Sequence, residues 1–341
     1  MGELLISFGL FSASILVCSL VYYISLSFFP LLTRNIDLYN QMRNNNLAVA
    51  ILTGGFVVSV TVIIYVSSIH IFLLFNNAVY ANIFENILRA IIMFTMSMFI
   101  SFLINWFTLK SFMFISNGID DMKELKNNNL AISILITSMI IATTYMVMES
   151  VGIINSAFII KKAIGEYGLQ IAFIDLNAFL NGTIQLLIML FTSLALFITG
   201  IKITSFVIKG VRDFVEFKSD NVAISLIVCS SILSVMIMVK YSISGPVKEI
   251  ISMLGNSFDI SRLLITILRF FYVLVTSTII SVLVLWLSMG IFLFLSRMFD
   301  SMNEIKKRNV STAIIVSVFT FSASFIMRSG VKEILKVINF F

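Results

Sequence analysis

The sequence predicts an all-α fold: a polytopic integral membrane protein of eight transmembrane helices, made from four parallel two-helix repeats. The chain has 341 residues, of which 59% are apolar and only 12% charged, whereas soluble domains carry roughly 25% charged residues. Its apolar runs are continuous rather than alternating segments of about ten residues, which favours helices over a membrane barrel. A short phrase that opens with Asn also recurs four times, at intervals of 83, 92 and 88 residues. Recurrence at so long a period indicates one supersecondary unit copied along the chain.

Each unit is expected to contain a long helix, a charged stretch that we call the elbow, and a shorter helix that begins at the repeated Asn. The eight spans cover approximately residues 4–30, 47–68, 88–116, 130–148, 183–209, 221–239, 263–297 and 309–327. The first run is longer than the core of a signal peptide and follows Glu3 rather than a basic stretch, so it is interpreted as a retained span. The units occupy residues 1–69, 70–149, 150–240 and 241–341, and together they form one membrane domain.

Because each unit has two spans, it begins and ends on the same side of the membrane. All four units enter the membrane in the same direction, and they are expected to surround a pseudo-fourfold axis or nested twofold axes. The connections 69–87, 149–182 and 240–262 and the tail 328–341 mix apolar and charged residues. This pattern favours short helices that lie in the membrane interface, with poorly ordered loops as the alternative.

Basic residues suggest an orientation. Thirteen of the 23 Lys and Arg residues lie in or beside the elbows, so the positive-inside rule places the elbows in the cytoplasm and both termini outside. Lys110 and Lys202, each 19 residues before its Asn, are expected to extend to the cytoplasmic surface; burial in the membrane would instead mark them as functional. Glu149, Lys240 and Arg328 lie at the outer ends of the shorter helices and are expected to reach water.

The elbows carry the strongest functional candidates. Spacings of three or four residues place an acidic or amide pair on one helix face in each elbow. One interpretation is structural: these are solvated last turns, and the Asn caps the next helix. The other is a ring of four elbows that binds cations or a cytoplasmic partner. The pairs are Asp37 with Gln41, Asp121 with Glu124, Asp213 with Glu216, and Asp300 with Glu304, and the repeated residues that follow are Asn46, Asn129, Asn221 and Asn309.

Small residues recur on the shorter helices. Four and eight positions after the Asn, every unit has a small side chain, which lets helices approach closely in lipid. The shorter helices are therefore expected to form the tightly packed inner layer, with a hydroxyl-lined path as the alternative. These positions hold Ala50 and Gly54, Ser133 and Thr137, Ser225 and Cys229, and Ala313 and Ser317.

The sequence disfavours enzymes and expects no cofactor or metal. It contains no phosphate-binding Gly-rich loop, nucleophile elbow, CxxC or HExxH motif. His70 is its only histidine, and the two cysteines, Cys18 and Cys229, lie inside apolar runs. The net charge of +6 is loop charge and does not point to nucleic acid. The expected partners are the lipid bilayer and a cytoplasmic or membrane protein, and the composition is compatible with a homo-oligomer.

The Asn-x-Ala phrase and the acidic residue before it resemble the YjfL-like family, bacterial membrane proteins named after domain of unknown function 350. The usual member carries two two-span units, so this chain looks like a doubled version with four. The resemblance implies a multi-pass protein of the bacterial inner (plasma) membrane linked to phage-shock-type envelope-stress systems, without an established activity. The positions that match are Glu124, Glu216, Glu304 and the four Asn residues, then Ala48, Ala131 and Ala223, with Gln41 and Ser311 as departures.

Two function hypotheses remain. The first is a non-enzymatic scaffold, or a component of an envelope-stress or membrane-maintenance system, that docks a cytoplasmic partner through acidic elbows. The second is an ion channel or transporter with a path between helices 47–68, 130–148, 221–239 and 309–327. A continuous polar cavity between these helices would favour transport, and a dry core of small residues would favour the scaffold.

Overall fold

A computed structural model describes most of the chain. The described residues are 2–33, 36–76, 83–116, 120–159, 162–165, 168–171, 174–207, 213–256, 260–295 and 301–338. They fold almost entirely into α-helices, and one small antiparallel hairpin interrupts the helical order. The predicted all-α class is therefore confirmed.

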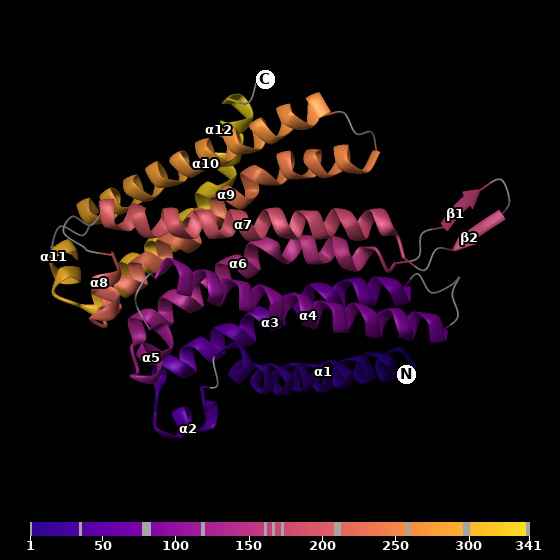
Figure 1. Ribbon diagram of the computed structural model, residues 1–341, viewed down its shortest axis with the longest axis horizontal. Helices are drawn as coiled ribbons and strands as arrows, with labels where there is room; N and C mark the ends of the chain where they lie inside the picture. The colour runs from indigo at the N-terminus through magenta and orange to yellow at the C-terminus, as the bar shows by residue number, and fades with distance from the viewer. Residues whose placement is uncertain are drawn as a thin grey trace.

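The elements follow a pattern of long helix, six-residue helix and long helix, which occurs four times (Figure 1). The first two triplets are α1 (Gly2–Leu32), α2 (Leu38–Arg43) and α3 (Leu47–Asn76), then α4 (Ile83–Ile115), α5 (Asp121–Lys126) and α6 (Leu130–Ser156). The last two are α7 (Leu176–Val207), α8 (Asp213–Lys218) and α9 (Val222–Asn256), then α10 (Ile260–Leu295), α11 (Ser301–Lys306) and α12 (Val310–Ile338). The hairpin joins α6 to α7 and consists of β1 (Lys162–Gly165) and β2 (Gly168–Ile171).

Length and composition make the described helices suited to a bilayer. Seven of them, α3, α4, α6, α7, α9, α10 and α12, are long and apolar enough to cross a membrane. Apart from its two ends, a helix satisfies its backbone groups internally, which a span in lipid requires. The side chains of α1 are described only from Val17 on, and the stretch Val17–Leu32 is too short by itself to count as a span, so the eighth span stays a prediction.

The helices that follow each Asn lie side by side in a row. α3 packs on α6, α6 on α9, and α9 on α12. The outer helices cover this row, α4 on α3 and α6, α7 on α6 and α9, and α10 on α9 and α12. The described contacts run along a line and do not close into a ring around a pseudo-fourfold axis, one of the two expected arrangements; the other, nested twofold axes, stays a prediction.

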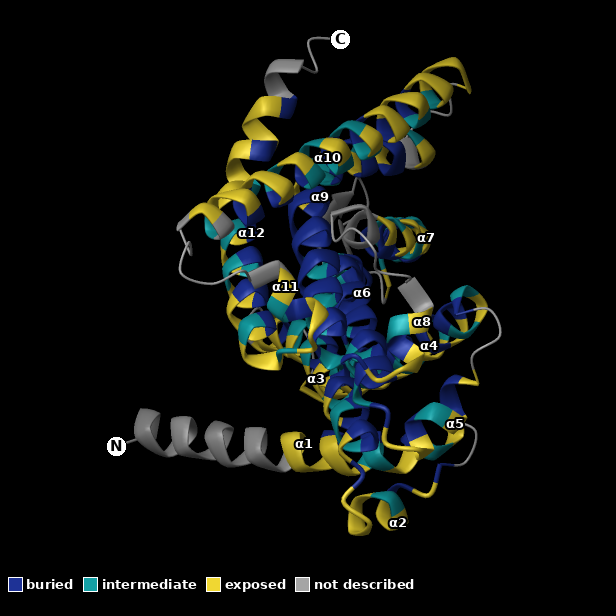
Figure 2. Ribbon diagram, turned by 90° about the vertical axis from the view of Figure 1, so that its left-hand side faces the viewer, coloured by how far each residue is buried: buried dark blue, intermediate teal, exposed yellow. Residues whose placement is uncertain are grey.

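Burial follows position in the row. α6 and α9 occupy its centre and are the most buried spans (Figure 2). α12 lies at one end of the row, where α9 is the row helix that it packs against. It is the least buried of the seven candidate spans. The prediction that the shorter helices form the inner layer therefore fits α6 and α9 and fails for α12.

The row helices are longer than the sequence suggested. α3, α6, α9 and α12 continue to Asn76, Ser156, Asn256 and Ile338, where separate interfacial helices had been expected. Charged residues such as Lys240 thus lie inside a continuous helix, because a polar side chain lowers hydropathy without breaking the backbone hydrogen-bond ladder.

Figure 1 places α2, α5, α8 and α11 together at one end of the molecule, and the N-terminus and the hairpin at the other end. All four elbows therefore share one face, as parallel units require.

Candidate functional site

Each six-residue helix ends in the same turn. The residue before the repeated Asn has a positive φ, between 54° and 66°, in all four elbows: Asn45, Asn128, Asp220 and Arg308. The backbone N–H of each Asn then donates to the carbonyl five residues back, as Asn129 does to Glu124 at 3.0 Å. This pair of features is the Schellman motif, which closes a helix with a left-handed residue.

The repeated Asn then begins the next long helix. Its Oδ1 accepts a hydrogen bond from the backbone N–H three residues on, at 3.0 Å for Asn46, 3.1 Å for Asn129, 3.3 Å for Asn221 and 3.2 Å for Asn309. This is the N-cap geometry, which satisfies a backbone donor that the helix itself leaves open. One residue therefore joins the end of one helix to the start of the next.

The same Asn side chain holds the predicted acidic or amide residue five positions back. Its Nδ2 donates to Gln41 at 2.7 Å, Glu124 at 3.1 Å, Glu216 at 2.9 Å and Glu304 at 3.1 Å. These four side chains are only half exposed. They therefore face their own elbow, and the structure does not bring them together as a ring.

The other predicted carboxylates have separate positions. Asp37 caps α2 by accepting from the Asn40 N–H at 3.0 Å. Asp121 is buried and accepts from the Ser116 hydroxyl at 2.8 Å, while its neighbour Asp120 is the residue that caps α5. Asp213 is the first residue of α8, and Asp300 lies outside the described residues.

Consecutive elbows are joined by repeated hydrogen bonds. Asn46 Nδ2 donates to the Leu125 carbonyl at 2.9 Å, and Asn129 Nδ2 donates to the Phe217 carbonyl at 3.0 Å. In return, Asn128 Oδ1 accepts from the Ala48 N–H at 3.0 Å, and Asp220 Oδ1 accepts from the Ala131 N–H at 2.9 Å. The first three elbows thus form one hydrogen-bonded array.

The fourth elbow is attached differently. Its left-handed residue is Arg308 rather than Asn or Asp, and the guanidinium donates to the carbonyl and hydroxyl of Ser219 at 3.2 and 3.0 Å. In this elbow, hydrogen bonds from Asn309 and then Lys307 hold the pKa of Glu304 below its ordinary value. The Lys307 ammonium lies 3.0 Å from the Glu304 carboxylate.

Exposed basic side chains also recur in the elbows, at a position that the sequence reasoning did not single out. Three residues before each Asn, every unit has an exposed basic side chain: Arg43, Lys126, Lys218 and Lys306. We call these four residues the basic row. Counting back from the Asn by three rather than five would have found it. In each elbow the Glu or Gln five residues before the Asn is therefore half-buried and the basic residue three before it is exposed, while Asp37, Asp120 and Asp220 are exposed as well.

The predicted packing residues differ in how far they are buried. Ser133 and Ser225 are buried, and the Ser133 hydroxyl donates to the Ala48 carbonyl of α3 at 2.5 Å. Ala313 and Ser317 are buried, whereas Ala50, Thr137 and Cys229 are half-buried. Gly54 is exposed and contacts nothing across the interface, which corrects its assignment. The close approach is at Gly55, where an added Cβ would lie 2.4 Å from Thr137 Cγ2.

Lys110 and Lys202 are both exposed on the surface of their helices. A different cation is fully buried: Arg89 of α4, which pairs with Glu85 at 2.5 Å and donates to the Phe158 carbonyl at 2.9 Å. Its signal in the sequence was Glu85, one helical turn earlier, on the same face. The pair closes the bundle beside the α6–α7 connection.

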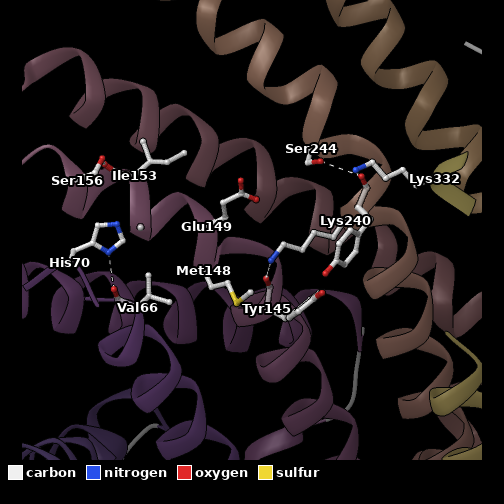
Figure 3. Close-up of a pocket in the computed structure, with 12 residues that line it drawn as sticks. Val66, His70, Tyr145, Met148, Glu149, Ile153, Ser156, Lys240, Ser244 and Lys332 are labelled. Carbon is white, nitrogen blue, oxygen red and sulfur yellow. Dashed lines mark hydrogen bonds between the residues drawn. The ribbon is translucent and has the colours of Figure 1, made fainter. Parts of the chain in front are cut away.

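A cavity of about 590 Å³ lies at the end of the row away from the elbows. All four row helices line it: α3 with Val66 and His70, α6 with Tyr145 to Ser156, α9 with Lys240 to Ser244, and α12 with Lys332. Figure 3 shows these side chains directed into one space. The sequence marked some of these residues as separate helix-end charges and did not predict that they meet.

Lys240 is the buried cation of this cavity, with 6% of its surface exposed. Its Nζ donates to the Tyr145 carbonyl and lies 4.1 Å from the centre of the Tyr145 ring. The Glu149 carboxylate lies in the same cavity but pairs with Lys248, at 2.9 Å. His70 Nδ1 lies 2.9 Å from the Val66 carbonyl and must donate there, which turns Nε2 away from that bond.

A polar cluster lies deeper between α3, α4 and α6. The Asn105 amide donates to the Ser59 hydroxyl at 3.0 Å, and the Ser59 and Thr144 hydroxyls are 2.6 Å apart. All three side chains are buried. Within the described residues, no group of three His, Cys, Asp or Glu side chains is placed to hold a metal ion.

Comparison with known proteins gives one match. The family model for the Domain of Unknown Function (DUF350) matches residues 3–159 and 178–331. Each segment holds two of the repeated Asn phrases. Neither the curated proteins nor the solved structures contain a match to this chain.

Proposed function

The chain belongs to the DUF350 family, and we propose that it is a non-enzymatic scaffold of the bacterial inner membrane that docks a cytoplasmic protein on its elbows. In this proposal it serves an envelope-stress or membrane-maintenance system, with the elbows in the cytoplasm and both termini outside.

The observation that carries the proposal is the basic row on a rigid support. The first three elbows are tied to each other by paired hydrogen bonds, and Arg308 ties the fourth to the third. The basic row therefore presents four cations at fixed positions on one face of the molecule. Such a fixed pattern suits electrostatic recognition of a complementary surface, so the partner is expected to be acidic at its contact.

The test is site-specific photo-crosslinking in cells. A photoreactive residue at Lys123 or Asn127, exposed neighbours of Lys126, should yield a discrete adduct with a cytoplasmic protein. The control places the photoreactive amino acid at Ile326 instead. Ile326 is 80% exposed on α12 and reports contacts made in the membrane region.

Charge reversal makes this test specific. Replacing Arg43, Lys126, Lys218 and Lys306 by Glu should abolish the adduct, while Lys110→Glu with Lys202→Glu should leave it intact. An adduct that survives reversal of the basic row, or repeated failure to obtain one with efficient labelling, would reject the scaffold.

The alternative is an ion channel or transporter with a path between the row helices. The buried cluster of Asn105, Ser59 and Thr144 favours it, because hydroxyl and amide groups in a membrane core are the groups from which paths are built. Between α3 and α6, however, Gly55 packs directly on Thr137.

Flux into proteoliposomes separates the two functions. Transport predicts a flux above that of empty vesicles, and a reduction by Ser59→Ala. A flux equal to that of empty vesicles across common ions, from correctly folded protein, would reject the alternative.

A further inference from the structure

The cavity at the end opposite the elbows has the composition of a ligand site. Its volume of about 590 Å³ lies within the range of about 300–1,000 Å³ that is typical of pockets for small molecules. Apolar side chains such as Val66, Met148 and Ile153 line it together with Lys240, Lys332 and Glu149. Apolar walls with a few convergent polar groups are typical of such sites.

The burial of the Lys240 ammonium is the main reason to expect a ligand in this cavity. A buried ammonium is costly unless it is paired and hydrogen-bonded, and Nζ has three donors. Within the described residues it makes one hydrogen bond, to the Tyr145 carbonyl, and one ring contact. The nearby Glu149 is engaged by Lys248. Glu149 still gives Lys240 a favourable charge interaction within the cavity. Only one of the three Nζ donors has a hydrogen-bond acceptor among the described residues, so the cation has capacity for a further anion.

The charge around the cavity favours an anion as well. Lys240 and Lys332 line it against one carboxylate, Glu149, which Lys248 neutralises. The Arg328 guanidinium lies near the rim, 4.8 Å from the ring centre of the lining residue Tyr241. The groups present therefore sum to an excess of positive charge.

Depth along the helices identifies the kind of anion. With a rise of 1.5 Å per residue, Tyr145 lies about 22 Å from the start of α6, Lys240 about 27 Å from the start of α9 and Lys332 about 33 Å from the start of α12. The hydrocarbon core of a bilayer is about 30 Å thick. If the helices start at the near edge of this core, Lys240 lies just inside its far edge and Lys332 beyond it, close to the phospholipid phosphates of the membrane face opposite the elbows.

We propose that this cavity binds a phosphate-bearing anion whose phosphate accepts hydrogen bonds from the Lys240 ammonium. Lysine binds phosphate as a point charge, and the apolar wall accommodates the rest of an amphiphile. Two sources share this chemistry, the headgroup of an anionic phospholipid and free inorganic phosphate. This proposal is independent of the elbow scaffold and stands if the scaffold fails.

The test measures two probes on the purified full chain. Native mass spectrometry from phosphatidylglycerol and from phosphatidylcholine nanodiscs counts retained lipids, and equilibrium dialysis measures inorganic phosphate. A headgroup site predicts one retained phosphatidylglycerol and no phosphate binding. A free-phosphate site predicts saturable phosphate binding of one per chain without lipid preference.

Variants link either result to the cavity. Lys240→Met should weaken binding by about tenfold or more, since it removes the buried cation. Glu149→Gln should strengthen it by removing the only carboxylate among the lining residues, and Lys332→Gln should weaken it. The matched control is Lys110→Met, an exposed lysine on another helix, which should bind as the wild type does.

Two results would overturn the proposal. One is the absence of binding by both probes. The other is binding that Lys240→Met, Glu149→Gln and Lys332→Gln leave unchanged. Because Lys332 is exposed and Glu149 half-buried, these two variants keep the test decisive if Lys240→Met does not fold.

Discussion

The repeated Asn combines roles that would otherwise need separate residues. Its backbone N–H donates the Schellman bond at one helix end, and its side chain caps the next helix and holds the side chain five positions back. This last contact explains why Gln41 can stand where the other units have Glu. The Gln41 Oε1 accepts from Asn46 as a carboxylate oxygen would, so the geometry needs an acceptor and not a charge.

Removing this residue should be most costly where it also joins two elbows. Asn129→Ala loses the helix cap, the bond to Glu124 and the bond to the Phe217 carbonyl. We expect a loss of about 2–4 kcal/mol of stability, since a cap is worth about 1 kcal/mol and each of the two further hydrogen bonds contributes about 0.5–1.5 kcal/mol.

Asn309→Ala is the matched control, because the described contacts of its side chain stay within the fourth elbow. Denaturant unfolding in detergent should find it less damaging than Asn129→Ala. Equal losses in the two variants would show that the bonds between elbows contribute nothing.

The pKa of Glu304 leads to a prediction about pH. Because that pKa is lowered in the folded state, the ionised carboxylate adds stability above the unfolded pKa, which is about 4.3. This contribution is lost as the pH falls through the folded pKa. The wild type should therefore be more stable than Glu304→Gln at pH 7, and the difference should vanish in acid. A difference in melting temperature that grows in acid would contradict this assignment.

At the scale of elements, the sequence predicted helix starts well and helix ends poorly. The row helices begin at Leu47, Leu130, Val222 and Val310, within one residue of the predicted starts, because a cap is a local signal carried by the Asn itself. Their ends were placed too early, because charges at Glu149, Lys240 and Arg328 resembled exits from the membrane. Those side chains instead lie at or near a cavity, which only tertiary structure reveals.

Substitution of the adjacent residues Gly54 and Gly55 tests how α3 packs on α6. Gly55→Ala should destabilise the protein by about 1–3 kcal/mol, because its Cβ would overlap Thr137 and overpacking costs this much. Gly54→Ala meets no neighbour and should stabilise by up to about 1 kcal/mol through helix propensity. Thermal unfolding of the two variants compares them directly. The opposite order would place the interface at Gly54.

At the scale of the whole molecule, four similar units form a row whose connections are not all equivalent. The bonds that join the first elbow to the second recur between the second and the third, but Arg308 replaces them at the fourth. The sequence displayed the fourfold repeat yet could not decide between ring and row. That choice depends on contacts between helices far apart in the sequence, such as α3 with α6 and α9 with α12.

The central claim is that the row separates a basic elbow face from a cavity face on the other side of the membrane. The most direct test is labelling of single cysteines in intact cells with a membrane-impermeant maleimide, after Cys18 and Cys229 are replaced by Ser. Lys332→Cys should be labelled from outside, and Lys126→Cys only after the cells are permeabilised. Labelling of both positions from the same side would contradict the arrangement on which both proposals depend.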